Sequence, residues 1–504
     1  MLLLLLIGAG LYLSRKQTPS RVATNGFDNK MDMVTENLKV TEYLDSINNK
    51  ETGLFESFVG SAHFIEDVRF PQIPMMRTAD GYLDNQAFTY DQALCLIAMI
   101  HMGQLDRTKE ILKVYESNFM IPKNGKRGLF TSYMADKFDY YFPSPSGEFN
   151  TMILGIDGDR IHVGPAVWIG LAAQHYYFRT RASDFIDFTV KMFLWARSMP
   201  HYTLKDGSNG SIAMGYGWGA PWEKIYSTEN ILDYYAFLKN LLAMVEQDDE
   251  RIMRNLSVNN LGISDIEEEV TNTENWFQQI GYNKRGTFSR GGFGPTEDGS
   301  FTIDQLDVLD VNSWAFSAIG PETMDKLGFD PFLISENTEK RFGVSVIEKG
   351  KKYSGFDFGA KESYSKRRDE SMIWWEGTGH MAVAYKLLAE YAQKKGDENL
   401  AYWLFEKHKF YLDEMTRFSD DLIQRDSGRL PYVSKLIKDK EISYVFDDWW
   451  PIARSNEPSV SEQKITPVSF EGRYVISIAS TLWRYFGAAG LNPFDATESD
   501  RQAN

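Results

Sequence analysis

Five carboxylic acids recur at one place in a repeated pattern of this chain. Asp91, Glu229, Asp310, Glu376 and Glu471 each lie at or near the first turn of a stretch whose composition predicts an apolar helix. Such a set can supply a protonated acid and an ionised base, the pair that general acid–base catalysis needs. The alternative is structural, because Asp is favoured as an N-cap and acids in a first turn oppose the helix dipole. The recurrence favours a set that lines one cleft.

Tryptophans accompany these acids. An apolar neighbour raises the pKa of a carboxyl group toward the range that suits a general acid, and an indole face can stack on a sugar ring. We therefore predict that the tryptophans line a groove; the alternative is that they close the ends of the core. His380, one turn past Glu376, either faces the same groove or is a satisfied core imidazole. The tryptophans concerned are Trp218, Trp222, Trp314, Trp374, Trp375, Trp449 and Trp450.

The elements that must position these residues form a sixfold repeat. Each unit has a loop rich in Gly and aromatic residues and then a helix that is apolar nearly all round; an amphipathic helix typically follows. A helix that is apolar on every face is buried, whereas one with a charged face lies outside. The predicted fold is therefore all-α, an (α/α)6 toroid with long cleft-forming loops and short β-hairpins in 281–303 and 427–446. The apolar helices begin near Tyr90, Gly164, Ser227, Leu309, Trp375 and Ser469, and the amphipathic ones include 38–47, 106–117, 182–197, 267–280 and 399–415.

Four fragments of the apolar helices carry a family resemblance. TYDQALCLIAM, STENILDYYAF, LDVNSWAFSAIG and WWEGTGHMAVAYKL resemble pieces of the six-hairpin glycosidase superfamily, (α/α)6 toroids that include glucoamylase-like and exopolysaccharide-associated bacterial proteins. The resemblance covers about residues 36–490. It implies a carbohydrate-active protein whose cleft lies at the N-terminal ends of the inner helices.

The same resemblance implies roles for particular acids. In glucoamylase-like toroids the general acid lies on the third inner helix and the base on the sixth, which correspond here to Glu229 and Glu471. We assign Glu229 as the general acid and Glu376 or Glu471 as the partner carboxylate, with inversion as the stereochemical outcome. Other toroid families place the pair on different hairpins, so Asp91 and Asp310 stay candidates for the cleft.

Composition excludes several other kinds of site. The 504 residues include 70 acidic and 54 basic side chains, a net charge of −16 that disfavours nucleic acid as a partner. One cysteine excludes a disulfide framework or a zinc site built from several thiolates. The seven histidines are scattered without a zinc-binding spacing, and 157–159 lacks the ligands of an EF-hand. The Gly-rich 290–294 lacks the context of a phosphate loop and is interpreted as a mobile cleft loop. We predict neither a metal nor a cofactor.

The beginning of the chain predicts export. Residues 2–13 are apolar, and as a helix they would span about 18 Å, short of the roughly 30 Å hydrocarbon core. They fit the apolar region of a signal peptide or a short membrane anchor. We therefore interpret 1–35 as a signal or anchor segment with a linker, and 36–496 as a single toroid catalytic domain. The predicted location is periplasmic, secreted or membrane-anchored, and the predicted assembly is a monomer.

Together these features predict a glycoside hydrolase. It would cleave a neutral or near-neutral polysaccharide or oligosaccharide between paired carboxyl groups. Three alternatives stay open: a non-catalytic exopolysaccharide-binding toroid, a polysaccharide lyase of the same fold, and a sugar epimerase. A lyase needs cations to neutralise a uronate carboxylate, and an epimerase needs cleft histidines, so a structure can separate them.

Overall fold

The computed structural model describes most of the chain and leaves several segments aside. Residues 1–32 of the predicted leader and linker lie outside the described residues, and so do Trp218, Trp449, Trp450 and Glu471. No described helix combines the length and the apolar character that crossing a bilayer requires. The described residues are 33–50, 52–59, 86–120, 127–135, 160–217, 221–247, 249–283, 285–295, 301–304, 307–360, 371–434, 474 and 476–501.

Six apolar helices form a closed inner ring. Each one packs against the next along the chain, and the last packs against the first. Buried side chains occur on every face of these helices, which confirms the predicted inner ring. The members are α3 (Thr89–His101), α5 (Val163–Thr180), α7 (Thr228–Gln247), α10 (Leu309–Ala318), α13 (Trp375–Lys394) and α16 (Ile478–Ala489).

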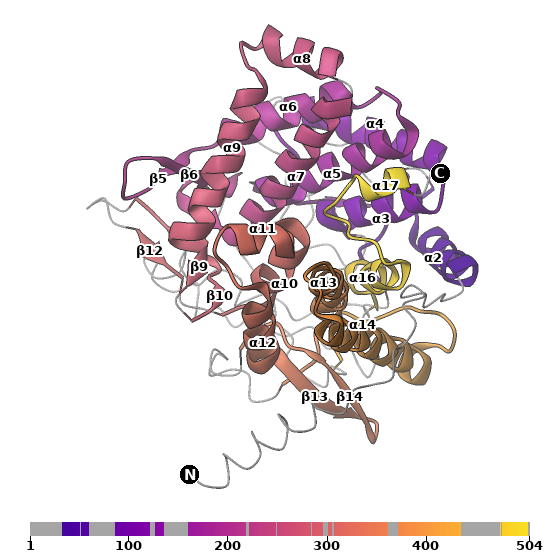
Figure 1. The fold of residues 1–504 in the computed structure, drawn as a ribbon. Helices are drawn as coiled ribbons and strands as arrows, with labels where there is room; N and C mark the ends of the chain where they lie inside the picture. The colour runs from indigo at the N-terminus through magenta and orange to yellow at the C-terminus, as the bar shows by residue number, and fades with distance from the viewer. Residues whose placement is uncertain are drawn as a thin grey trace, which may run out of the picture.

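A second layer of helices surrounds this ring (Figure 1). Helix α4 packs on α3 and α5, α6 on α5 and α7, α9 on α7, α12 on α10, α14 on α13 and α16, and α2 on α16. The architecture is thus the predicted (α/α)6 toroid. The outer helices are α2 (Met33–Ile47), α4 (Leu105–Met120), α6 (Ile186–Arg197), α9 (Ile263–Trp276), α12 (Pro331–Phe342) and α14 (Glu398–Phe418), with the short α8 (Asp249–Val258), α11 (Pro321–Lys326) and α17 (Glu498–Arg501) beside them.

The sixth inner helix begins later than the sequence predicts. Helix α16 starts at Ile478 rather than near Ser469, and Ser477 caps it by accepting a hydrogen bond from the backbone N–H of Ser480. The residues just before it, β15 (Ile476–Ser477), pair as a strand with β1 (Phe58–Val59). An apolar run that passes from strand into helix has no change of polarity to mark the boundary. Glu471 therefore does not belong to the first turn of α16.

Short extended segments lead into the inner helices and tie their starts together. Strands β2 (Gln86–Phe88), β4 (Arg160–His162), β8 (Ile225–Ser227) and β15 lead into α3, α5, α7 and α16, and single bridges at Val308 and Trp374 lead into α10 and α13. Their partners include β3 (Ser132–Met134), β7 (Gly215–Gly217), β11 (Gly291–Phe293) and β1. The other strands are β5 (His201–Thr203), β6 (Asn209–Ile212), β9 (Tyr282–Asn283), β10 (Thr287–Phe288), β12 (Thr302–Ile303), β13 (Gly343–Glu348) and β14 (Lys351–Phe356).

One hydrogen bond repeats at all six helix starts. The backbone N–H of the first residue of each inner helix donates to a carbonyl of a neighbouring extended segment. The N–H groups of a first helical turn have no partner inside the helix, so these bonds satisfy one of them at each start. They also fix all six starts at one end of the ring. The pairs are Thr89 to Thr131, Val163 to Met214, Thr228 to Arg290, Leu309 to Phe358, Trp375 to Tyr432 and Ile478 to Ser57.

The C-terminal segment fills the opposite end of the ring. Phe494 is 2% exposed, and α17 packs against α5 (Figure 1). The Asn240 side chain, near the end of α7, donates to the Phe494 carbonyl and accepts from the backbone N–H of Ala496. The C-terminal segment therefore closes one end of the ring. The starts of the inner helices, which carry the predicted acids, form the opposite end.

Candidate functional site

Four of the five predicted acids come together at the helix starts. Asp91, Glu229, Asp310 and Glu376 come from α3, α7, α10 and α13; Asp310 and Glu376 act electrostatically on Glu229, and Glu376 acts on Asp91. Burial raises the pKa of Asp91 and of Glu376 to about 8 each, and that of Asp310 to about 6. The Glu229 side chain is half-buried and keeps some exposed surface. Its pKa is still raised well above the usual range, by burial as the largest cause and by the Asp310 charge as the next.

Helix capping does not account for these acids. The residues in the N-cap position of α3, α10 and α13 are Phe88, Val308 and Trp374, none of which caps through its side chain. Asp310 accepts a hydrogen bond from the backbone N–H of Val311 at 2.7 Å. The Glu229 carboxyl makes no hydrogen bond to any described residue. All four acids do lie in first helical turns, so of the structural alternative the capping part is excluded for three helices and the part that concerns the helix dipole stays open.

A chain of hydrogen bonds supports Glu376. The Tyr90 hydroxyl donates to Glu376 Oε1 at 3.0 Å and accepts from the Trp483 indole at 2.7 Å. The Tyr90 bond opposes the effect of burial on the Glu376 pKa. Tyr90 was not among the predicted site residues, although it directly precedes Asp91.

His380 lies one turn past Glu376 but in the interior. Its Nε2 is 3.6 Å from Glu376 Oε1 and accepts a hydrogen bond from the Trp314 indole at 3.2 Å. Burial lowers its pKa well below the usual range, so the ring is neutral. An acceptor Nε2 and full burial favour the alternative of a satisfied core imidazole.

Helix α7 carries a second buried acid that the sequence analysis missed. Asp233 lies one turn past Glu229, is 1% exposed and accepts a hydrogen bond from the Trp168 indole at 2.9 Å. Burial raises its pKa well above the usual range. An acid on the buried side of an apolar helix was the available signal, since buried carboxyl groups are rare without a partner.

Tyr432 lies among the acids. The charges of Glu376, Asp310, Asp91 and Glu229 all raise its pKa, after the effect of burial itself. Its backbone carbonyl also accepts from the first N–H of α13. Tyr432 and Tyr90 are both only half-buried, so each keeps some exposed surface beside these acids.

Arg290 brings a positive charge to one side of the cluster. Its guanidinium pairs with Asp304, with Nη2 2.6 Å from Oδ2, and its charge lowers the pKa of both Glu229 and Asp310. Gly291 follows in the left-handed region at φ 135°, where a β-carbon would collide with the Tyr226 carbonyl. The Gly-rich segment is therefore a strand held against β8, which corrects its interpretation as a mobile loop.

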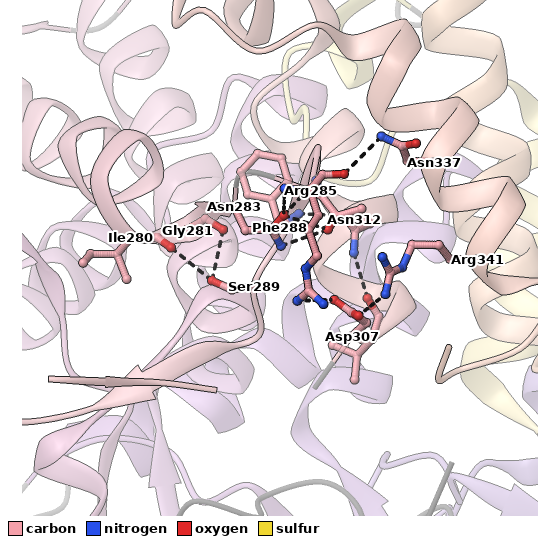
Figure 2. A network of polar contacts seen from close by, with 12 residues as sticks. Ile280, Gly281, Asn283, Arg285, Phe288, Ser289, Asp307, Asn312, Asn337 and Arg341 are labelled. Atoms are coloured by element: carbon pink, nitrogen blue, oxygen red, sulfur yellow. Dashed lines mark hydrogen bonds and ion pairs between the residues drawn. The ribbon is translucent and has the colours of Figure 1, made fainter. Parts of the chain in front are cut away.

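A polar network fixes this segment to the start of α10 (Figure 2). Asn312 accepts from the Phe288 backbone N–H and donates to the Val308 carbonyl, both at 2.8 Å. Asp307 pairs with Arg285 at 3.1 Å and with Arg341. These contacts join the β9–β10 hairpin, just before Arg290, to the helix that carries Asp310.

The four predicted groove tryptophans that the structure describes are buried. Trp375 packs against Phe418 between α13 and α14, with ring centroids 4.6 Å apart. Trp222 is covered by the ring of His162 at 4.6 Å and by the guanidinium of Arg160 at 5.1 Å. Neither offers an open face to a sugar.

Trp314 and Trp374 lie closer to the acids, each with its ring near His380, at 5.5 and 5.3 Å. They are 4% and 3% exposed. Trp314 and Trp374 therefore pack in the core beside the acids, as expected if the tryptophans close the end of the core and do not line a groove.

No group of three His, Cys, Asp or Glu side chains in the described ranges is arranged to hold a metal ion. The cluster can instead exchange protons: it combines several protonated carboxyl groups with one acid, Asp310, whose pKa of about 6 leaves it mostly ionised at neutral pH.

The fold and the cluster define an (α/α)6 toroid with an acid-bearing mouth. No protein-family model matches the chain, and no curated protein matches it. Among solved structures it is similar to a cellobiose 2-epimerase from Bacillus thermoamylovorans B4167, at 11% identity over 80% of this chain and 92% of the other, with a TM-score of 0.49. It is also similar to a glycosidase, at 10% identity over 94% and 100% of the two chains, with a TM-score of 0.47. A family 76 glycoside hydrolase from a bovine Bacteroides thetaiotaomicron strain is 9% identical over 92% and 78%, with a TM-score of 0.47.

Proposed function

We propose that the protein is a glycoside hydrolase that cleaves a neutral or near-neutral oligosaccharide or polysaccharide. The observation that carries the proposal is the pair formed by Glu229 and Asp310. Both lie in the first turns of inner helices. Burial raises the pKa of each carboxyl group and so favours its protonated form. Glycoside hydrolysis uses one protonated and one ionised carboxyl group.

The two acids take different roles because their surroundings differ. Glu229 keeps its proton, since its pKa is raised by burial and by the charges of Asp310 and Asp233. Asp310 is the more acidic of the two, since the Val311 N–H and then Arg290 stabilise its charge. Glu229 would therefore protonate the leaving oxygen, and Asp310 would activate the attacking water.

This division revises the predicted partner carboxylate. Glu376 has a pKa of about 8, so at neutral pH it is protonated and serves better as a hydrogen-bond donor to the sugar than as a base. Glu471 lies outside the described residues, and its role stays a prediction. Export and the monomeric state likewise stay predictions.

The charges around the cluster favour an uncharged substrate. Among the described residues, Arg290 is the cation that acts on Glu229 and Asp310, and it is already paired with Asp304. From the described residues, a uronate would therefore gain no further counter-charge beside these two acids, which disfavours a lyase. His380 already accepts a hydrogen bond through Nε2, which disfavours its use as the base of an epimerase.

Digestion of a glycan panel, with the product anomer followed by NMR, tests the proposal. We expect release of a sugar with inverted configuration, and its loss in Glu229→Gln and Asp310→Asn. Glu246→Gln, an exposed acid at the other end of α7, is the matched control and should remain fully active. Full activity in both cleft variants would refute the assignment. Binding of a glycan without cleavage by the unaltered protein would favour the non-catalytic toroid.

A further inference from the structure

We propose that Phe494, in the C-terminal segment, is a positioning residue for the acid cluster. It packs on three indoles whose N–H groups support the residues beside the acids. Its effect on activity rests on the proposed function, whereas its effect on the indoles does not.

Three indole N–H groups make equivalent contacts around the ring. Each indole comes from one inner helix and donates to a side chain of the next, so the three donors and three acceptors together involve all six helices. The pairs are Trp168 of α5 to Asp233 of α7 at 2.9 Å, Trp314 of α10 to His380 of α13 at 3.2 Å, and Trp483 of α16 to Tyr90 of α3 at 2.7 Å.

Every acceptor lies next to an acid of the cluster. Asp233 is one turn past Glu229 and raises its pKa. His380 is one turn past Glu376, with 3.6 Å between Nε2 and Oε1. Tyr90 donates directly to Glu376 at 3.0 Å. The indoles therefore fix the positions of Asp233, His380 and Tyr90, the side chains next to the acids.

Phe494 contacts all three indoles from the closed end of the ring. Its ring centroid is 4.6 Å from that of Trp168, 5.4 Å from that of Trp314 and 6.3 Å from that of Trp483. It is itself held in place, because its carbonyl accepts from Asn240 at 2.7 Å. One side chain thus fixes three donors at once without entering the acid-bearing mouth.

Close packing makes this contact specific. A smaller or differently shaped side chain leaves the indoles free to tilt toward the space, and the N–H donors move with them. Displacements of about 1 Å at a catalytic group can cost about a hundredfold in rate. The effect should fall on kcat more than on KM, because Phe494 has no access to the substrate.

The test is Phe494→Leu, with Phe188→Leu as the matched control. Phe188 is fully buried and packs on Phe119 between α6 and α4, and no ring contact among the described residues joins it to the three indoles. We expect Phe494→Leu to shift the side-chain N–H resonances of Trp168, Trp314 and Trp483 together in 15N-tryptophan spectra. We also expect kcat to fall about tenfold or more and its pH profile to move. Phe188→Leu should lower the unfolding temperature without either change.

Two further measurements keep the result decisive. If Phe494→Leu does not fold, Phe494→Met has a similar volume but a more flexible side chain that fills irregular space better, and it should give the same pattern more weakly. Trp314→Phe keeps an aromatic ring, although a smaller one, and removes one donor; it should alter the pH profile while the other two indole resonances shift less than in Phe494→Leu. Unshifted indole resonances in the Phe494 variant, or equal kcat changes in the Phe188 control, would overturn the proposal. If no glycan is cleaved, the proposed function fails, and the resonances still decide the role of Phe494.

Discussion

The two sides of the acid cluster are built alike but are held in different charge states. On one side Glu229 and Asp310 share the charge of Arg290, and Asp310 also accepts a backbone N–H. On the other side the hydrogen-bond partners of Asp91 and Glu376 are neutral: the Ser57 hydroxyl for Asp91, and the Tyr90 hydroxyl and the Trp374 side chain for Glu376.

Both sides are buried, yet the pKa of Asp310 rises only to about 6, whereas those of Asp91 and Glu376 rise to about 8. Burial favours the neutral form of any carboxyl group, so burial by itself makes no base. The backbone N–H of Val311, and after it the charge of Arg290, make Asp310 the acid of the cluster that is ionised at neutral pH. The comparison therefore predicts that the Arg290 side does the chemistry and the Tyr90 side binds.

The largest effect should separate the two sides by activity. Glu229→Gln and Asp310→Asn should each lower kcat/KM by about 10²- to 10⁴-fold, the usual contribution of general acid–base catalysis. Asp91→Asn and Glu376→Gln should cost about tenfold or less, because an amide replaces a neutral carboxyl group with a similar hydrogen-bonding shape. Steady-state kinetics on the cleaved glycan measures both. Equal losses on the two sides would remove the distinction.

The next effect should come from the cation. Arg290→Gln removes the charge that lowers the Asp310 pKa, so that pKa should rise above about 6 and the acid limb of the pH–rate profile should move to higher pH. The variant would also lose the buried ion pair with Asp304, at a cost of about 3–5 kcal/mol. Arg290→Lys keeps the charge and is the control; it should retain the original limb. An unmoved limb in Arg290→Gln would show that another group ionises Asp310.

Stability should depend on pH through the Tyr90 side. The folded-state pKa of Glu376, about 8, lies above its unfolded value, so the folded protein binds the proton more tightly. That stabilisation is complete below about pH 4, where both states are protonated, and it is lost as pH rises through about 8. Each such group changes stability by at most about 1.4 kcal/mol per pH unit.

Urea unfolding between pH 5 and pH 8 measures this slope. Glu376→Gln should reduce it, and Glu246→Gln should leave it unchanged. A slope that is identical in the Glu376 variant and the unaltered protein would contradict the assigned pKa.

The smallest effect on activity should come from a tryptophan that the sequence placed in the groove. Trp375→Phe should lower stability by about 1–3 kcal/mol, because the indole fills the space against Phe418. Its kcat/KM should stay within about twofold of the original if the side chain only closes the core. A rise in KM at unchanged stability would restore Trp375 as a sugar platform.

The sequence located the inner helices well where composition changes sharply at their starts. Apolar residues on all faces marked α3, α5, α7, α10 and α13, and four acids of the site followed from their first turns. The start of α16 was missed because an apolar strand runs directly into it. Tyr90, Tyr432 and Asp233 were missed because each acts through contacts with residues distant in the chain.

The order of the helices, their burial and the shared end of their first turns were all decided by the sequence, since local patterns of polarity encode them. Which acids pair, and which one is ionised, was decided only by the tertiary structure. The charge of Arg290 acts on Asp310 because the Asn312 contacts hold the segment that carries Arg290 against α10. Tyr90 of α3 donates a hydrogen bond to Glu376 of α13, a helix that is distant in the chain. Charge interactions depend on distance through space and on burial, and neither quantity is written in the spacing of residues along the chain.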